Sequence, residues 1–282
     1  MDKFYFGTHI NVYENYINST KLVKKFGGNF VQIFITIPGQ QKTSNISNKD
    51  LIDFKTFLMD NDMKVVVHSS YLHNLARDWD PHSWWLKNLE LEIKYASVIG
   101  AIGVVIHFGK RMELSIEEAY NNMYTSLIYI HNKTKKYKDV KLILETSTGQ
   151  GTEICYKLED LGYFYKKFSK NNNKEIKDRI KLCVDTCHVF AAGYDLKTKD
   201  NVDFFLQTFE ELIGLNHIYL IHLNDSKMDV GSNKDRHENI GEGHIGIIGL
   251  DYFFKYFRNL KIPIILETPG GKYEEEIKLL KS

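Results

Sequence analysis

The sequence lacks the features that mark secreted and membrane-spanning proteins. Its 282 residues include three cysteines, Cys155, Cys183 and Cys187, an odd number with no secreted disulfide framework. No apolar run is long enough to cross a bilayer, and the opening residues MDKFYFGTHI show no signal-peptide pattern. We therefore expect an intracellular protein that is not secreted, has no membrane partner and keeps its cysteines as free thiols.

An excess of one charge is also missing. Lysine and arginine number 37 and aspartate and glutamate number 36, so the formal net charge is +1. Domains that coat nucleic acid broadly carry a strong basic excess, so any nucleic-acid contact here must come from local clusters of charge. The hydrophobic content of 43% and the charged content of 26% are ordinary for a globular protein.

The sequence does contain a regular alternation of short β-rich runs and helical segments. The β-rich runs occupy residues 5–10, 30–35, 64–67, 103–106, 141–144, 182–184, 218–221 and 262–266. Helical periodicity is clearest between them at residues 51–59, 84–99 and 116–130. This alternation predicts an α/β fold, a single (β/α)8 TIM-barrel domain spanning residues 1–282. No glycine-rich dinucleotide fingerprint follows the first run, which argues against a doubly wound open sheet.

Six successive β-rich runs are each followed directly by a residue that can bind a metal ion. These residues are His68, His107, Glu145, Asp185, His222 and Glu267. The C-terminal ends of barrel strands converge on one face, and histidines with carboxylates suit zinc, manganese or iron. Any one of them could have a structural role instead, as Asp185 would if it capped a helix. Six in succession favour a metal centre at that face.

Two more segments add candidate ligands. His188 follows Asp185 closely in the sequence DTCH, and the loop after the seventh run contains Asp235 and His237 on either side of Arg236. Alternate side chains of an extended loop share a face, so Asp235 and His237 can approach one ion together with His188. The glycine and asparagine content of the loop would equally suit a flexible polar connection.

Three structural expectations accompany these candidates. Residues 190–195 are expected to form a loop, and the charged residues 166–181 to form solvated loop and helix surface. Cys183 and Cys187 could serve as zinc ligands, but Cys183 lies within an apolar run and is expected to act as a small buried hydrophobic residue.

The chain resembles endonuclease IV, the family of metal-dependent apurinic/apyrimidinic DNA endonucleases. The matching segments follow the family's order along almost the whole chain: HSSYLHNL (68–75), IHFGK (106–110), LETSTGQG (144–151), CVDTCHVFAAGYDL (183–196), HLNDSK (222–227), GSNKDRHENIGEGHIG (231–246) and ILETP (265–269). The DTCH and DRH…GEG segments are the most specific of these signals.

The resemblance implies a TIM barrel with three zinc ions per chain, manganese being an alternative at one site. The ligands of the first ion would be His68, His107 and Glu145. The ligands of the second would be Glu145, Asp185, His222 and Glu267. The ligands of the third would be His188, Asp235 and His237. The expected residue type stands at all nine positions.

The resemblance also implies a repair reaction on double-stranded DNA. A hydroxide held between two ions would hydrolyse the phosphodiester 5′ to an abasic site, leaving a 3′-hydroxyl and a 5′-deoxyribose phosphate. The catalytic carboxylates would be Glu145, Asp185 and Glu267, and no protein nucleophile would be needed. Such an enzyme would be a monomer in the cytoplasm, or wherever the genome is kept.

DNA recognition is implied for the loops above the barrel. Tyr71 and Leu72 match a family pair that enters the minor groove. Positive charge near the phosphates could come from Lys110, Arg111, Lys227, Lys234 and Arg236. Residues 9–13 lack the small residues typical of the family's first loop, and Gly39 stands where its arginine fills the gap in the base stack. A Gly39→Arg substitution is therefore expected to leave DNA binding unchanged or to tighten it.

Two alternatives remain open at the level of sequence. A sugar isomerase or epimerase on the same barrel would use histidines and carboxylates at strand ends, but would have no use for Asp235 and His237. A non-catalytic binder of damaged DNA would not need the complete set of ligands.

Overall fold

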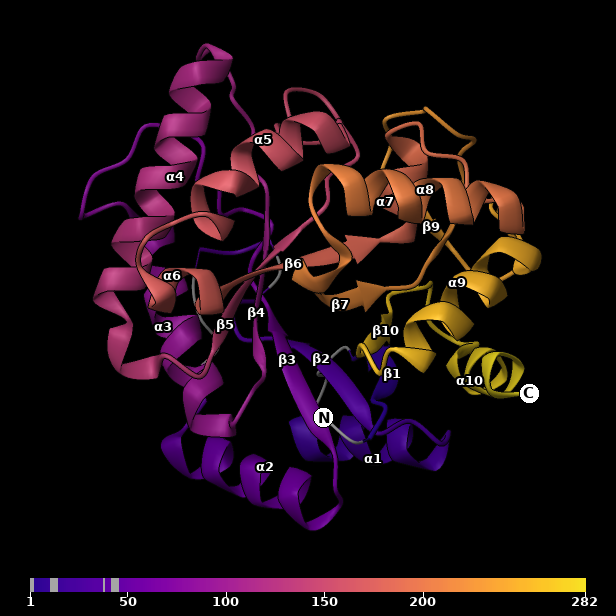
Figure 1. Ribbon diagram of the computed structural model, residues 1–282. Coiled ribbons are helices and arrows are strands. Elements are labelled where there is room, and N and C mark those ends of the chain that lie inside the picture. Colours follow the sequence, from indigo (N-terminus) through magenta and orange to yellow (C-terminus); the bar gives the residue numbers. More distant parts are fainter. Residues whose placement is uncertain (1–2, 11–14, 38, 42–45) are drawn as a thin grey trace.

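The architecture is a barrel of eight parallel strands (Figure 1), and the computed structural model describes residues 3–10, 15–37, 39–41 and 46–282. The barrel strands are β1 (Phe6–His9), β2 (Phe30–Phe34), β3 (Lys64–His68), β4 (Gly103–His107), β5 (Lys141–Glu145), β6 (Ile180–Asp185), β7 (Ile218–His222) and β10 (Ile264–Leu266). Their spatial order is β1-β10-β7-β6-β5-β4-β3-β2, and β1 also pairs with β2, which closes the barrel. The predicted TIM barrel is confirmed.

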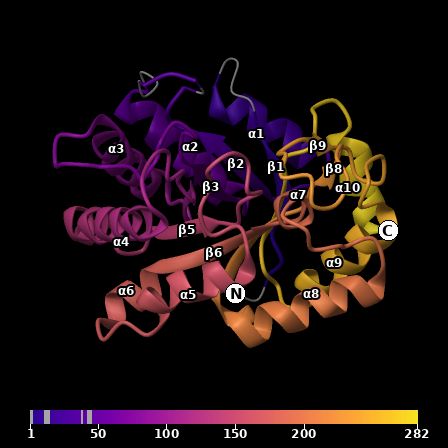
Figure 2. The same cartoon turned by 90° about the horizontal axis from the view of Figure 1, so that it is seen from above.

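Helices surround the barrel in both views (Figures 1 and 2). They are α1 (Tyr16–Lys25), α2 (Asn48–Asp60), α3 (Trp84–Ile99), α4 (Ile116–Lys133), α5 (Leu158–Ser169), α6 (Lys174–Arg179), α7 (Thr186–Ala191), α8 (Lys199–Leu212), α9 (Ile247–Asn259) and α10 (Tyr273–Lys281), with short 3-10 turns η1 (Lys135–Tyr137) and η2 (Leu215–His217). Capping boxes at Ser47 and Ser115 begin α2 and α4, and Gly100 ends α3 in the left-handed conformation. None of the helices in the described ranges is long and apolar enough to span a membrane.

The interior of the barrel explains why polar residues gather at one end. Its apolar layer takes one side chain from each strand or its flank: Tyr5, Phe30, Val66, Val105, Ile143, Cys183, Leu220 and Ile265. Side chains alternate between the two faces of a strand, so the residue two positions later points into the same interior. On six strands that residue is one of the predicted ligands, and on β2 it is Gln32. The apolar layer therefore forms the floor beneath a polar layer.

Two structural expectations are confirmed only in part: residues 192–195 lie outside any helix and most of residues 166–181 are exposed or part-buried, but each stretch has exceptions. Residues 190–195 begin inside α7, because the side chain of Asp185 accepts a hydrogen bond from the His188 backbone N–H (2.9 Å) and caps this helix. Arg179, in the stretch expected to be solvated, is buried because its guanidinium finds acceptors on three residues. These are Val140 (3.2 Å), His131 (3.1 Å) and Thr134 (2.8 Å). By contrast, Cys183 is buried as predicted, and all three cysteines are free.

Candidate metal centre

Glu145 lies at the middle of a cluster of imidazoles. It ends β5, is fully buried, and its Oε2 lies 3.3 Å from His68 Nε2 and 3.4 Å from His107 Nε2. Its Oε1 lies 2.8 Å from His222 Nδ1 on β7. Four strand ends, on β3, β4, β5 and β7, thus direct a ligand atom toward one point.

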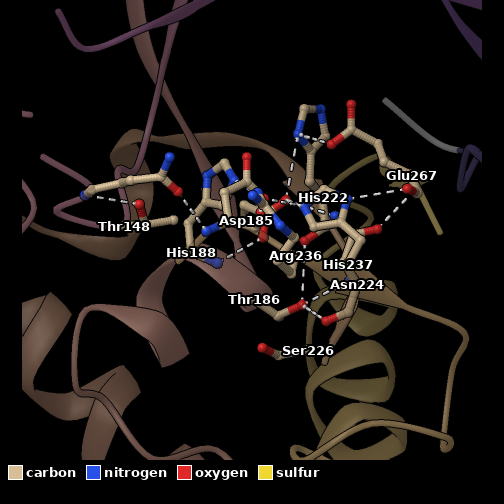
Figure 3. A network of polar contacts seen from close by, with 12 residues as sticks. Thr148, Asp185, Thr186, His188, His222, Asn224, Ser226, Arg236, His237 and Glu267 are labelled. Carbon is tan, nitrogen blue, oxygen red and sulfur yellow. Dashed lines mark hydrogen bonds and ion pairs between the residues drawn. The ribbon is translucent and has the colours of Figure 1, made fainter. Parts of the chain in front are cut away.

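A second carboxylate approaches the same imidazole from β10. Glu267 Oε2 lies 3.0 Å from His222 Nδ1, and Asp185 Oδ2 lies 3.9 Å from that nitrogen. Ligand atoms of Glu145, Asp185, His222 and Glu267 all lie within 4.8 Å of one another. Asn224 links two of these carboxylates, because its Nδ2 donates to Asp185 Oδ2 (2.6 Å) and its Oδ1 accepts from the Glu267 N–H (2.7 Å; Figure 3).

The remaining predicted ligands meet beside this group. Asp235 Oδ1 lies 3.3 Å from His188 Nε2 and 3.2 Å from His237 Nε2, and His237 Nε2 is 3.7 Å from Asp185 Oδ2. Cys187 also comes within 4.8 Å of Asp235 and His237, but burial raises the pKa of its thiol to about 12. The structure therefore brings all nine predicted ligands together, with Cys187 as a neighbour of the third set.

The hydrogen bonds of the imidazoles fit a metal ion. Three rings donate their outer N–H to a backbone carbonyl: His68 to Ser69 (2.7 Å), His188 to Thr146 (2.8 Å) and His237 to Glu267 (3.1 Å). Such a bond fixes the ring tautomer and leaves the inner nitrogen free to bind a cation. The inner Nε2 atoms of His188 and His237 are buried and, among the described residues, face Asp235 Oδ1 at 3.3 and 3.2 Å without a hydrogen bond of good geometry.

The pKa shifts within the cluster also favour binding of cations. Burial raises the pKa of the Glu145 carboxyl, but His107 and His222 outweigh burial and hold that pKa well below its usual range. Burial lowers the pKa of the His188 imidazole, but Asp185 and Asp235 outweigh it and raise that pKa well above 6.5. The buried carboxylates thus hold protons on their histidine neighbours, and a divalent ion could replace those protons.

One carboxylate holds the loop that carries Asp235 and His237. Asp225 belongs to the short strand β8 (Asp225–Ser226). This strand pairs antiparallel with β9 (His237–Glu238). The buried side chain of Asp225 accepts backbone hydrogen bonds from five residues, Ser226, Gly241, Gly243, Ile245 and Gly246, at 2.8–3.3 Å. A Cβ at position 243 would lie 2.5 Å from Asp225 Oδ1, so this close approach requires glycine. The GEG segment (residues 241–243) therefore packs closely around the Asp225 carboxylate and donates backbone hydrogen bonds to it.

We expect Asp225→Ala to lower the free energy of unfolding by about 3 to 5 kcal/mol, because it leaves two buried and three part-buried N–H groups without their acceptor. Urea denaturation with and without zinc would measure the change. The matched control is Asp229→Ala in the same loop, whose exposed carboxylate pairs with Lys197, and which should alter stability little. Equal losses for the two variants would contradict this role of Asp225.

The predicted DNA contacts are brought only partly together. A cavity of about 590 Å³ opens above the cluster, and Tyr71, Lys110 and Arg236 line it. Tyr71 is exposed, and Lys110 Nζ lies 3.6 Å from Glu153 Oε1. The other predicted contacts lie outside the lining of the cavity: Leu72, Arg111, Lys227 and Lys234.

Gly39 has a constrained backbone in the loop after β2. Its φ is +76°, and a Cβ there would lie 3.2 Å from the Tyr71 hydroxyl. Any L side chain is strained in this conformation, so Gly39→Arg carries a conformational cost in the folded protein, and its effect on DNA binding stays a prediction. The neighbouring residues 11–13, 38 and 42 of the two recognition loops lie outside the described residues.

Sequence reasoning missed two residues beside the cluster, Gln32 and His9. Burial lowers the pKa of His9 to about 4, so its imidazole is neutral at physiological pH. The available signal was a single polar residue at an inward position of the apolar run FVQIF, two residues after Phe30.

Comparisons with known proteins agree with the barrel fold and show the family of the chain. The family model for xylose isomerase-like TIM barrels matches residues 20–282. The probable endonuclease 4 of Thermosipho africanus is 36% identical, with 98% of each chain covered. The structure of endonuclease IV from Thermus thermophilus superposes with a TM-score of 0.82 at 23% identity, covering 98% of this chain and 97% of that one. A D-tagatose 3-epimerase-like protein shares the fold with a TM-score of 0.72 at 17% identity, covering 97% and 94%.

Proposed function

The chain belongs to the endonuclease IV family of xylose isomerase-like TIM barrels, and from this membership we propose that it is a DNA-repair endonuclease. Its reaction is hydrolysis of the phosphodiester 5′ to an abasic site in duplex DNA, which gives a 3′-hydroxyl and a 5′-deoxyribose phosphate. The observation that carries this proposal is the cluster of nine histidine and carboxylate side chains, seven of which line one cavity while Asp185 and His222 lie buried beside them.

The metal centre of this proposal holds three zinc ions, one on each of the three ligand sets, with manganese as an alternative at one. A bound divalent ion lowers the pKa of its water ligand and so would supply a hydroxide nucleophile at neutral pH. The ions would also neutralise negative charge on the phosphate. The carboxylates of Glu145, Asp185 and Glu267 hold these ions and are the catalytic residues of the chain. The apolar layer below them closes the floor of the site to solvent.

The rim of the cavity supplies the contacts to DNA. Lys110 and Arg236 line it and can pair with phosphates on either side of the lesion. Tyr71 projects from the loop after β3 as an exposed aromatic side chain, a shape suited to entering a base step, with Leu72 beside it. An abasic nucleotide leaves the stack cheaply because it has no base to unstack.

The decisive test is incubation of zinc-loaded protein with a duplex that carries one abasic site. Cleavage on the 5′ side of the lesion, with an intact duplex left uncut, supports the proposal. Parallel incubation with ketohexoses would detect epimerase activity, which the shared fold permits. Sugar epimerisation without DNA cleavage would replace the proposed function, and tight abasic-DNA binding without cleavage would identify a damage binder.

We expect Tyr71→Ala to weaken binding to abasic duplex about tenfold or more, because it removes an aromatic surface that stacks against a base. Titration on abasic and intact duplexes at several salt concentrations measures this, and the remaining phosphate contacts should make the affinity fall steeply with salt. Tyr163→Ala, which removes an exposed tyrosine of α5 outside the cavity, is the control. Unchanged affinity for Tyr71→Ala would place the intercalating contact elsewhere.

A further inference from the structure

Gln32 occupies a position among the ligands that belongs to no ligand set. It lies on β2, is fully buried, and points into the barrel at the level of the cluster. Its Oε1 lies 2.8 Å from His222 Nε2, and its Nε2 lies 2.5 Å from Glu267 Oε1. One amide therefore contacts two predicted ligands from different strands.

This contact determines how His222 can bind a cation. His68, His188 and His237 donate their outer N–H to backbone carbonyls, whereas the partner of His222 is the side chain of Gln32. When His222 Nε2–H donates to Gln32 Oε1, Nδ1 carries the lone pair. That Nδ1 faces Glu145 Oε1 at 2.8 Å and Glu267 Oε2 at 3.0 Å. The tautomer of His222 thus depends on a single replaceable side chain.

His9 completes the hydrogen bonding of the amide. Gln32 Nε2 lies 3.0 Å from His9 Nδ1, so one amide hydrogen goes to His9 and the other to Glu267 Oε1. This arrangement leaves Glu267 Oε2 directed toward the cluster. His9 is itself held edge-on against Phe34, with ring centroids 4.6 Å apart. All the hydrogen-bonding groups of the amide have partners, which fixes its orientation.

We propose that Gln32 is a positioning residue for the metal centre, which sets the tautomer of His222 and the orientation of Glu267, and that His9 acts through Gln32 by fixing its amide. The inference rests on the metal centre of the proposed function. It does not depend on which bond the enzyme cleaves.

The test measures zinc release without DNA. Gln32→Met keeps the side-chain length but removes both hydrogen-bonding ends, and His9→Phe keeps a flat ring but removes the acceptor. Each protein is loaded with zinc, freed of excess and mixed with a colour-forming chelator, while elemental analysis gives the starting stoichiometry. We expect Gln32→Met to release one class of zinc about 10- to 100-fold faster than the parent. His9→Phe should accelerate the same class by a smaller factor.

A double variant distinguishes action through Gln32 from an independent role of His9. If His9 acts through the amide, the double variant releases zinc no faster than Gln32→Met alone. In addition, the ¹⁵N resonance of His222 Nε2 should show a protonated nitrogen in the parent and a mixture of tautomers in Gln32→Met. If the accelerations of zinc release caused by the two single substitutions multiply in the double variant, His9 acts independently of Gln32. That result would overturn the role given to His9.

Ser126→Ala is the control for a purely structural effect, because Ser126 is a buried polar residue of α4 that donates to Leu75 O (3.0 Å). It should lower the melting temperature of the metal-free protein without changing zinc release. Zinc release at the parent rate in Gln32→Met would overturn this inference alone. A parent that holds no zinc would overturn the metal centre together with it, and zinc binding without DNA cleavage would overturn only the proposed reaction.

Discussion

Glu145→Gln is expected to lower the rate of cleavage at an abasic site by at least about 10³-fold, because it weakens metal stabilisation worth several kcal/mol. Glu145 is the carboxylate whose two oxygens face three imidazoles, His68, His107 and His222, at 2.8–3.4 Å. Glutamine keeps the shape but removes the negative charge that Glu145 would supply to the two proposed ions whose ligand sets it shares. Single-turnover cleavage of an abasic duplex, combined with elemental analysis, would show lost zinc and lost rate together.

The control for charge is Glu153→Gln. Glu153 lines the same cavity but accepts hydrogen bonds from Thr148 Oγ1 and the Gln150 N–H, at 3.0 Å each, and is absent from the described ligand groups. The Glu153→Gln protein should retain the zinc content of the parent and lose much less activity than Glu145→Gln. A Glu145→Gln protein that cleaves near the parent rate, with its circular dichroism unchanged, would show that Glu145 does not bridge two ions.

Removal of metal is expected to abolish cleavage and to lower the melting temperature, and zinc should restore both. Elemental analysis of protein purified without chelator should give about three ions per chain. A free metal concentration 1,000 times the dissociation constant stabilises a folded protein by about 4 kcal/mol per site, or roughly 10 °C for a chain of this size. The physical reason is the buried set of carboxylates, which without metal must be balanced by protons on the histidines.

Calorimetry of metal-free and zinc-loaded protein, followed by cleavage assays on both, measures this prediction. Magnesium in place of zinc is the matched control, since it prefers oxygen ligands and should restore little of either property. Active protein that contains one ion or none would contradict the scheme of three ligand sets. Full activity in excess chelator would contradict the metal centre itself.

The sequence by itself determined the barrel and the placement of most predicted ligands. Eight β-rich runs with helical segments between them predict parallel strands, and a polar residue directly after an apolar run must lie at the C-terminal mouth of a barrel. This holds for His68, His107 and Glu145 because local periodicity alone sets which face a strand residue occupies. The segment DRH could likewise be interpreted through its spacing and its resemblance to a known family.

Only the tertiary structure decided how these side chains are held. Gln32 meets His222 and Glu267 across 190 and 235 residues of sequence, because barrel closure sets β2 near strands that are distant in the chain. The burial of Arg179 and the hydrogen bonds to the Asp225 carboxylate also depend on backbone groups from other elements. Hydrogen-bond partners of this kind have no local sequence signal, because they follow from strand register and loop packing in three dimensions.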